Sequence, residues 1–314
     1  MNQNDLEHFY LNLSELLSAG ISLPDALKKL QIATKFNETP LAEAQLKLQA
    51  GKIASAWEVL NLPRRDGRLL EAGQKGGNLE AICRSLASLY QEWNNMCEKL
   101  FFTSLWYFFT GLVACGVGAV FVFLAAGPQT ALIVFSLLGG SWFVFSFSSF
   151  KNFKRLIMTS SHGKSNLLAS LPLLKTVYKH LNLFLLFFQW EIMYSAGINT
   201  SKILARLSKD FPQFNPILNI TAKKTSQGTS LSELPHFRDI MPATDYNRIV
   251  TGEESGKLNE TLKQLKDKHR NKLRNLVGNL PRLLLLVFYL LFIPIAFGVI
   301  IYFWINYFNR IFSI

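Results

Sequence analysis

The residues that could carry chemistry are a Gly-Lys-Ser run, five histidines and three cysteines. Gly163, Lys164 and Ser165 match the end of a phosphate-binding loop, but that loop needs a glycine where Met158 stands and an apolar strand before it. The histidines lack His-x-x-x-His spacing and the cysteines lack Cys-x-x-Cys spacing, so neither set matches a usual metal site. We expect no catalytic residue, no cofactor and no metal, and we do not expect an enzyme. The five histidines and three cysteines are His8, His162, His180, His236, His269, Cys83, Cys97 and Cys115.

Two adjacent acidic residues, Glu253 and Glu254, are the candidate binding residues of the sequence. One interpretation places them near a helix start after Gly252, where each would stabilise the helix dipole by about 0.3–1 kcal/mol. The other makes them a contact surface for a partner protein. The glycines that recur through the sequence are expected to occupy turns and helix caps rather than contact sites. They are Gly20, Gly73, Gly77, Gly197, Gly252 and Gly256.

The elements that position these residues follow from the distribution of charge. The chain has 314 residues, and it carries no charged residue from 101 to 150 or from 283 to 309. Charged side chains make up about a quarter of an ordinary globular protein, so stretches of this length without one are typical of membrane helices. The sequence therefore predicts an integral membrane protein in contact with lipid.

The charge-free stretches are long enough for three membrane spans. A bilayer core of about 30 Å needs about 20 apolar helical residues. Residues 101–150 are too many for one helix, and Gly127 and Pro128 indicate a turn in their middle. We predict spans at about 101–125, 131–150 and 283–307.

Lysines and arginines predict the orientation of these spans. They cluster after residue 150 and before residue 283, whereas the turn at 126–130 has none, so the polar blocks should be cytoplasmic. The N-terminus would then be cytoplasmic and the C-terminus external, in a multi-pass protein of the cytoplasmic membrane. Residues 151–282 carry a net charge of +12, against −1 for residues 1–100. A nucleic-acid site is the alternative for this basic excess, but its position beside the spans favours a topology signal, and no direct nucleic-acid binding is expected.

One further apolar segment, residues 181–194, is 14 residues long and contains Glu191. Its length favours a buried or membrane-surface helix over a fourth span.

The two polar blocks contain an internal repeat. Tyr10–Leu30 matches Phe187–Leu207 at an offset of 177, and Ala72–Leu79 matches Thr251–Leu258 at an offset of 179. Apolar residues recur at helical spacing, and no segment alternates with a period of two. The fold class is therefore predicted to be all-α, with two homologous cytoplasmic helical-bundle domains and three transmembrane helices. The predicted organisation is a first domain at 1–100, a transmembrane hairpin at 101–150, a second domain at 151–282, a third transmembrane helix at 283–308 and a short external tail at 309–314.

Local signals support helix starts and close helix packing. Ser22 with Asp25, and Ser230 with Glu233, have the spacing of a capping box. Small residues four positions apart, at 114 and 118 and again at 136 and 140, allow membrane helices to approach closely. These small residues could close the hairpin internally or receive the span of a partner.

The order of these features resembles the type II secretion F domain, present twice. The resemblance is carried by Ala-Gly-Ile at 19–21 and 196–198, by Gly51 and Gly228, and by Gly-Glu-x-Ser-Gly-x-Leu at 252–258. The first copy departs from this pattern, since Gln74, Lys75 and Gly76 stand where the second has Glu253, Glu254 and Ser255.

This resemblance implies a platform protein of a type II secretion, type IV pilus or competence pseudopilus machine. Its expected partners are a hexameric assembly ATPase, pilin or pseudopilin subunits, and further copies of itself. Glu253 and Glu254 would then contact the ATPase or a second copy. The short outer turn and the Lys/Asn/Phe-rich composition favour the competence branch, which takes up DNA.

Two other functions compete with the platform. One is a small membrane transporter or channel subunit, against which the spans argue because they hold no ionisable residue except Cys115 and tyrosines. The other is a membrane-tethered nucleic-acid binder that uses the basic block.

Overall fold

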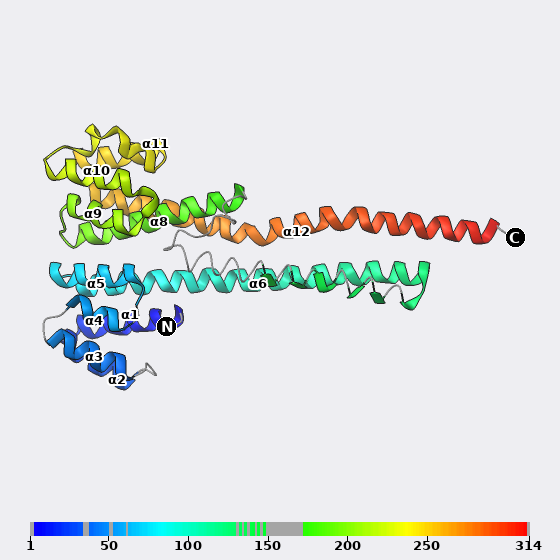
Figure 1. The fold of residues 1–314 in the computed structure, drawn as a ribbon, viewed down its shortest axis with the longest axis horizontal. Coiled ribbons are helices and arrows are strands. Elements are labelled where there is room, and N and C mark those ends of the chain that lie inside the picture. Colours follow the sequence, from blue (N-terminus) through cyan, green and yellow to red (C-terminus); the bar gives the residue numbers. More distant parts are fainter. Residues whose placement is uncertain are drawn as a thin grey trace. The chain divides into compact units, whose positions relative to one another are not determined.

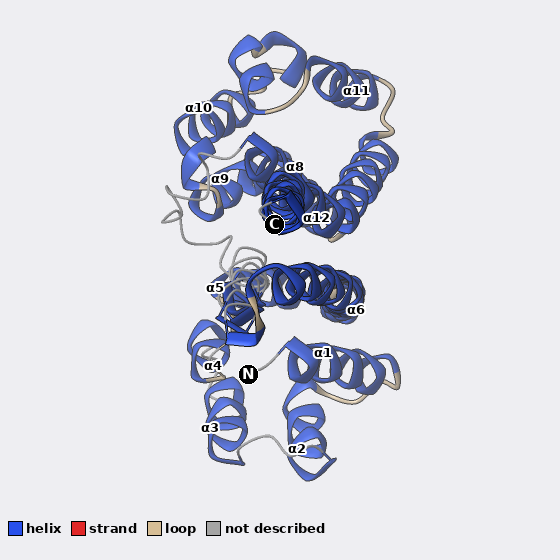
Figure 2. Cartoon of the chain, turned by 90° about the vertical axis from the view of Figure 1, so that its right-hand side faces the viewer, coloured by secondary structure: helices blue, strands red, loops and turns tan. Residues whose placement is uncertain are grey.

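The computed structural model describes residues 3–312 apart from several gaps. The gaps are 34–37, 50–52, 61, 130–131, 134, 137–138, 142, 145–146 and 149–171. Every regular element in the described ranges is a helix, which confirms the all-α class (Figures 1 and 2).

The helices fall into an N-terminal and a C-terminal series, each of which ends in one very long helix (Figure 1). The first series is α1 (Gln3–Ser18), α2 (Leu23–Ala33), α3 (Glu38–Gln49), α4 (Ile53–Val59), α5 (Arg64–Gly76) and α6 (Leu79–Ala126). The second is α8 (Pro172–Ser195), α9 (Thr200–Asp210), α10 (Asn215–Ser226), α11 (Ala243–Glu254) and α12 (Leu258–Phe312), with 3-10 turns η2 (Pro212–Phe214), η3 (Leu231–Glu233) and η4 (Pro235–Ile240).

The chain forms two compact units. Unit 1 comprises Met1–Asn95 and Ser160–Leu273, and unit 2 comprises Met96–Thr159 and Arg274–Ile314. Helices α6 and α12 each begin in unit 1 and continue into unit 2. Both predicted helical domains therefore fall largely within unit 1, and their division at 1–100 and 151–282 stays a prediction.

Unit 1 has the apolar core that the helical spacing predicts. Leu6, Phe9 and Leu13 recur on one face of α1 and are all buried. They share the core with side chains from the start of α6, such as Ile82 and Leu86. Burial of such side chains contributes about 1.5–3 kcal/mol each, so this core can hold the short helices in place.

Four of the recurring glycines end helices, as the sequence predicts. Gly20 and Gly197 follow α1 and α8 with φ angles of 77° and 75°, and Gly77 and Gly256 follow α5 and α11 with φ angles of 72° and 68°. This left-handed conformation strains a residue that has a Cβ atom, so glycine is the residue that fits. Ser22 also caps α2 as predicted, since its hydroxyl oxygen accepts from the Asp25 N–H at 3.4 Å and its hydroxyl donates to Asp25 Oδ2 at 2.6 Å.

The apolar segment 181–194 lies in α8 and is a core helix of unit 1. All residues from 181 to 190 are buried, including Gln189 and Trp190, each with no exposed surface. A helix that is apolar on every face must be covered on every face. This burial confirms the prediction of a buried helix over that of a fourth span.

Unit 2 contains the part of α6 that is apolar and exposed. Phe102, Trp106 and Val113 are 67%, 70% and 63% exposed. Among the described residues, Leu79–Leu124 is the one segment long and apolar enough to cross a membrane, and only 19% of its most apolar window is buried. Helix α6 ends at Ala126, where a turn is predicted, and Gly127 follows with a φ angle of 92°.

The other two predicted spans are described less completely. Much of 131–150 lies outside the described residues. The segment 283–307 lies in the continuous helix α12, but many of its side chains are also outside that description. Three spans therefore stay a prediction, and one candidate span is observed.

Candidate functional site

Gly73 and Gly252 are points of close helix packing. We expected turns or caps at these positions, and that expectation is wrong, because Gly73 lies inside α5 and Gly252 inside α11. A Cβ atom on Gly252 would lie 2.9 Å from the Thr261 Cβ of α12, and one on Gly73 would lie 3.2 Å from the Leu79 Cα of α6. Glycine is therefore required for α5 to approach α6, and for α11 to approach α12, this closely.

A buried carboxylate, Asp66, lies in the first turn of α5 and joins three helices. Its Oδ2 atom accepts hydrogen bonds from the hydroxyl of Tyr10 of α1 at 3.0 Å and from that of Tyr90 of α6 at 2.5 Å. The two tyrosine rings stack with centroids 5.7 Å apart. Arg65 Nε lies 3.6 Å from the other oxygen. Asp66 thus ties α1 and α6 to the start of α5.

Burial controls the protonation of the Asp66 site. It raises the pKa of Asp66 above the ordinary value of 3.8, although the positive charge of Arg65 and the two tyrosine hydroxyls oppose the rise. Burial, followed by the charge of Asp66, also raises the pKa of Tyr10 well above 10. The hydroxyls therefore keep their protons and remain donors at any physiological pH.

A second buried carboxylate, Asp245, occupies the matching place in the first turn of α11. Its Oδ2 atom lies 2.9 Å from Nε2 of His269 of α12, and its Oδ1 atom accepts from Lys268 Nζ at 2.5 Å. The Nδ1 atom of His269 lies 2.9 Å from Nδ1 of His180 of α8. A chain of buried polar groups therefore runs from α11 through α12 to α8.

The hydrogen-bond partners keep Asp245 charged. Burial alone would raise its pKa, but the hydrogen bonds from His269 and Lys268, together with the electrostatic attraction of these two side chains, lower it to about 2. Asp245 and Asp66 thus occupy matching positions, but the pKa of Asp245 is lowered and that of Asp66 is raised.

Neither aspartate was predicted, although the sequence carries a signal for both. Asp66 and Asp245 match at the same offset of 179 that relates Ala72–Leu79 to Thr251–Leu258. Each follows a proline by three positions, and each bonds a residue 24 positions later, Tyr90 or His269. An acidic residue that both halves retain beside a helix start would have identified the pair.

The two acidic residues that were singled out, Glu253 and Glu254, lie at the end of α11 rather than near a helix start, which corrects that interpretation. Glu253 Oε2 accepts from the Ser230 hydroxyl at 2.9 Å and from the Leu231 N–H at 2.8 Å. Glu253 thus fastens η3 to α11. Glu254 is exposed, and its contact with a partner stays a prediction.

Ser230 also departs from expectation. Its hydroxyl oxygen accepts from the Ser232 N–H at 3.3 Å, so it caps the short 3-10 turn η3 rather than an α-helix.

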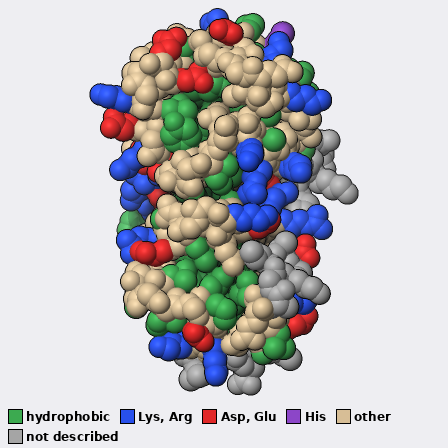
Figure 3. Space-filling model, turned by 90° about the vertical axis from the view of Figure 1, so that its left-hand side faces the viewer, with side chains coloured by type: hydrophobic (Ala, Val, Ile, Leu, Met, Phe, Trp, Pro, Cys, Tyr) green, Lys and Arg blue, Asp and Glu red, His purple; other side chains and the backbone are tan. Residues whose placement is uncertain are grey.

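Ion pairs join the N-terminal and C-terminal helices within unit 1. Arg68 of α5 pairs with Asp210 of α9, and Arg270 of α12 lies 3.6 Å from Glu92 of α6. Arg206 of α9 donates to the Arg68 carbonyl at 3.4 Å. Burial raises the pKa of Asp210 to about 6 despite the positive charge of Arg68. On the face shown in Figure 3, basic and acidic side chains lie around apolar ones, and basic side chains gather at its right-hand side.

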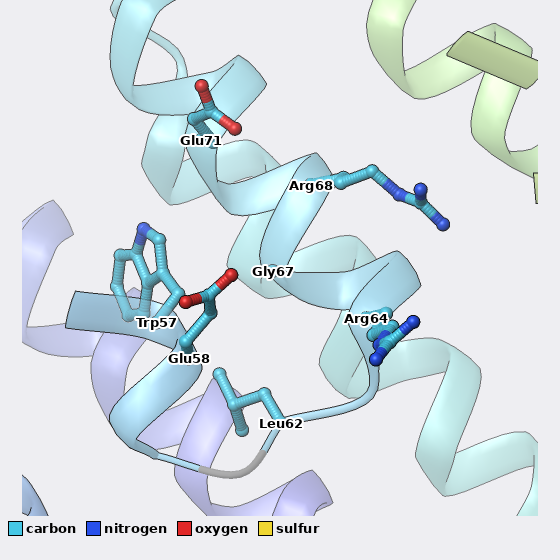
Figure 4. A pocket seen from close by; sticks show the side chains of 7 residues that line it. All are labelled: Trp57, Glu58, Leu62, Arg64, Gly67, Arg68 and Glu71. Atoms are coloured by element: carbon cyan, nitrogen blue, oxygen red, sulfur yellow. The ribbon is translucent and has the colours of Figure 1, made fainter. Parts of the chain in front are cut away.

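A cavity of about 610 Å³ lies beside this network (Figure 4). It is lined by Trp57, Glu58, Leu62, Arg64, Gly67, Arg68 and Glu71. Two arginines and two glutamates give this lining no net charge. It is therefore suited to a polar segment of either sign rather than to a strongly charged ligand.

The cysteines and the other candidate metal ligands do not gather into a metal site in the described part of the chain. Among the described residues, no group of three or more His, Cys, Asp or Glu side chains could hold a metal ion. In the described ranges, Cys83, Cys97 and Cys115 form no disulfide bond. Burial and the neighbouring Glu80 raise the pKa of Cys83, which keeps this thiol protonated and unreactive.

The described residues thus form an all-helical class of protein, in which one helix, α6, is long and apolar enough to cross a membrane. Residues 9–126 match the family model described as type II secretion system (T2SS), protein F. The match begins in α1, ends with α6 and contains Asp66, Tyr90 and Gly73. It confirms the predicted resemblance for this part of the chain and supports the platform-protein family of type II secretion and type IV pilus machines. No curated protein matches the chain.

Proposed function

We propose that the chain is the membrane platform of a machine that assembles pilus-like filaments, and that it has no enzymatic activity of its own. The observation that carries this proposal is the protein F match over residues 9–126. That segment joins a bundle held by Asp66 to a helix whose apolar side chains are exposed, as a lipid-facing span requires.

The proposed membrane arrangement has three spans, at 101–125, 131–150 and 283–307. The apolar exposure of α6 supports the first span, and the basic residues before 283 and after 150 support cytoplasmic polar blocks. The N-terminus would then lie in the cytoplasm and the C-terminus outside it.

The proposed energy source is a hexameric assembly ATPase that binds the polar helices, since the Gly-Lys-Ser run at 163–165 lacks the rest of a phosphate-binding loop. Charged side chains of both signs on the face of Figure 3 suit a polar protein contact of this kind. We place the acidic part of the contact on Glu254, because Glu253 is occupied by Ser230 and Leu231. Pilin or pseudopilin subunits would pack on the apolar helices, and a homo-oligomer would present several such surfaces.

Among the machines of this type, we propose the competence branch, in which the filament supports DNA uptake. The five-residue outer turn leaves almost no mass outside the membrane, which suits a minimal machine.

Binding of the ATPase tests the proposal. The full chain in lipid nanodiscs should bind the assembly ATPase encoded with it, and should not hydrolyse ATP alone. Glu254→Lys should weaken this binding at least tenfold, whereas Asp239→Lys, which reverses another exposed charge, should leave it within twofold. Substrate flux through proteoliposomes without any ATPase binding would instead support a transporter.

A further inference from the structure

The Asp245 site contains two imidazoles where the Asp66 site contains two phenols. His269 and His180 are 1% and 7% exposed, and they follow one another in a line from the carboxylate. In contrast, both Tyr10 and Tyr90 bond Asp66 directly. The phenols of the Asp66 site already carry their protons, whereas each imidazole of the Asp245 site has a ring nitrogen that can bind a further proton.

When both imidazoles are neutral, every ring nitrogen that faces another group of the site has a hydrogen-bond partner. Because Asp245 is ionised, His269 donates to it through Nε2–H. The Nδ1 atom of His269 is then an acceptor, so His180 must donate through Nδ1–H across the 2.9 Å that separate the two atoms. Each tautomer is thus fixed by its neighbour.

One added proton keeps both hydrogen bonds. A proton from solvent binds Nδ1 of His269, which then donates in both directions and lies as an imidazolium against the Asp245 carboxylate. His180 moves its own proton from Nδ1 to Nε2 and accepts through Nδ1. A second proton would have to bind Nδ1 of His180, so that two N–H groups on two positive rings would face each other at 2.9 Å. That state loses the bond between the rings.

The surroundings oppose a charge on His180. Burial, the neighbouring His269, Lys272 and Lys179 together lower the pKa of His180 to about 4 from the ordinary 6.5, and Asp245 only partly offsets them. The charged groups that face the two rings are Lys179 of α8, Lys268 and Lys272 of α12, and Asp245 of α11. An apolar side chain also contacts the site, since the Phe187 ring stacks on His269 with centroids 5.5 Å apart.

The chain of buried polar groups formed by Asp245, His269 and His180 lies near the point where α12 passes from unit 1 into unit 2. His269 precedes Leu273, the last residue of unit 1, by about one helical turn. We propose that Asp245, His269 and His180 form a proton-binding site that fastens α12 to α11 and α8, keeps its bonds with one proton and opens between the imidazoles with two. Acidification would then loosen the N-terminal part of α12 from α11 and α8, whereas the Asp66 site would keep the N-terminal part of α6 attached to α1 and α5.

Two measurements on the full chain in detergent micelles test this site. The first is the ¹³Cε1 NMR titration of the five histidines, in which one resonance should titrate well below the others. The second is the unfolding equilibrium in denaturant. A histidine whose pKa is 6.5 unfolded and about 4 folded raises the unfolding constant about thirtyfold between pH 8 and pH 5.

The matched variants are His180→Asn and His236→Asn. Asparagine can place an amide donor near the position of Nδ1 but cannot take up a proton, so His180→Asn should remove most of the thirtyfold change. His236 is exposed, and His236→Asn should leave the change as it is in the wild type. An equal pH dependence in wild type and His180→Asn would overturn the proposal. If His180→Asn does not fold, the NMR titration decides, since five resonances that titrate together near pH 6.5 would also overturn it.

Discussion

Replacement of Gly252 by alanine tests how closely α11 must approach α12. In an unobstructed helix, Gly→Ala stabilises by about 0.5–1 kcal/mol, because alanine restricts the unfolded chain. At Gly252 the new Cβ would lie 2.9 Å from the Thr261 Cβ and 3.3 Å from its Cγ2. A Cβ atom is fixed to the backbone and cannot rotate away, so the helices must separate. Overpacking of this kind costs about 1–3 kcal/mol, and the variant should lose about 1–2 kcal/mol in total.

The matched control is Gly278→Ala in α12, where a Cβ atom would meet nothing within 4 Å. The two variants should change the free energy of unfolding in opposite directions, as measured by denaturant titration of the full chain in micelles. The double variant Gly252→Ala with Thr261→Gly should recover part of the loss, because removal of the Thr261 side chain from α12 leaves space for the new Cβ atom on α11. If Gly252→Ala is as stabilising as Gly278→Ala, the close approach of α11 to α12 is not real.

Three further predictions concern the buried polar groups. Tyr90→Phe removes a 2.5 Å hydrogen bond to Asp66 and should cost about 1.5–3 kcal/mol of unfolding free energy, whereas Tyr178→Phe in α8, where no hydrogen bond is at stake, should cost less than about 0.5 kcal/mol. Glu253→Gln should expose η3 to proteolysis, because two bonds to a charged oxygen are weakened, and equal cleavage of Glu253→Gln and Glu254→Gln would contradict this role. The raised pKa of Asp210 gives a contribution to stability that is full below about pH 3.8 and is lost as pH rises to about 6, at most about 3 kcal/mol. Unfolding of Asp210→Asn at pH 4 and pH 7 should lack this loss, and an unchanged difference would refute the assignment.

The helical class and the caps could be predicted because they depend on local spacing. Leu6, Phe9 and Leu13 recur at helical intervals, and Gly20 and Gly197 follow α1 and α8 in matching sequences. A glycine that ends a helix acts through its own φ angle, so its neighbours in sequence reveal it.

Gly73 and Gly252 were misassigned for the opposite reason. Their role depends on Ile82 and Thr261, side chains of the next helix, and no local pattern distinguishes a glycine needed for space from one needed for φ.

The repeat relates the positions of the two aspartates, but their burial could be found only from the fold. An aspartate in the first turn of a helix is common because it favours the dipole, so its presence does not indicate burial. The burial of Asp66 and Asp245 depends on α1, α6, α8 and α12, which come from distant parts of the chain.

The central claim is that this chain is the platform on which a filament is assembled, and a count of surface filaments tests it most directly. A strain that lacks the chain should carry no filaments, as seen by electron microscopy of whole cells, while its ATPase and pilins are still made. Expression of the intact chain should restore the filaments. Normal filament numbers in the strain without the chain would contradict the claim.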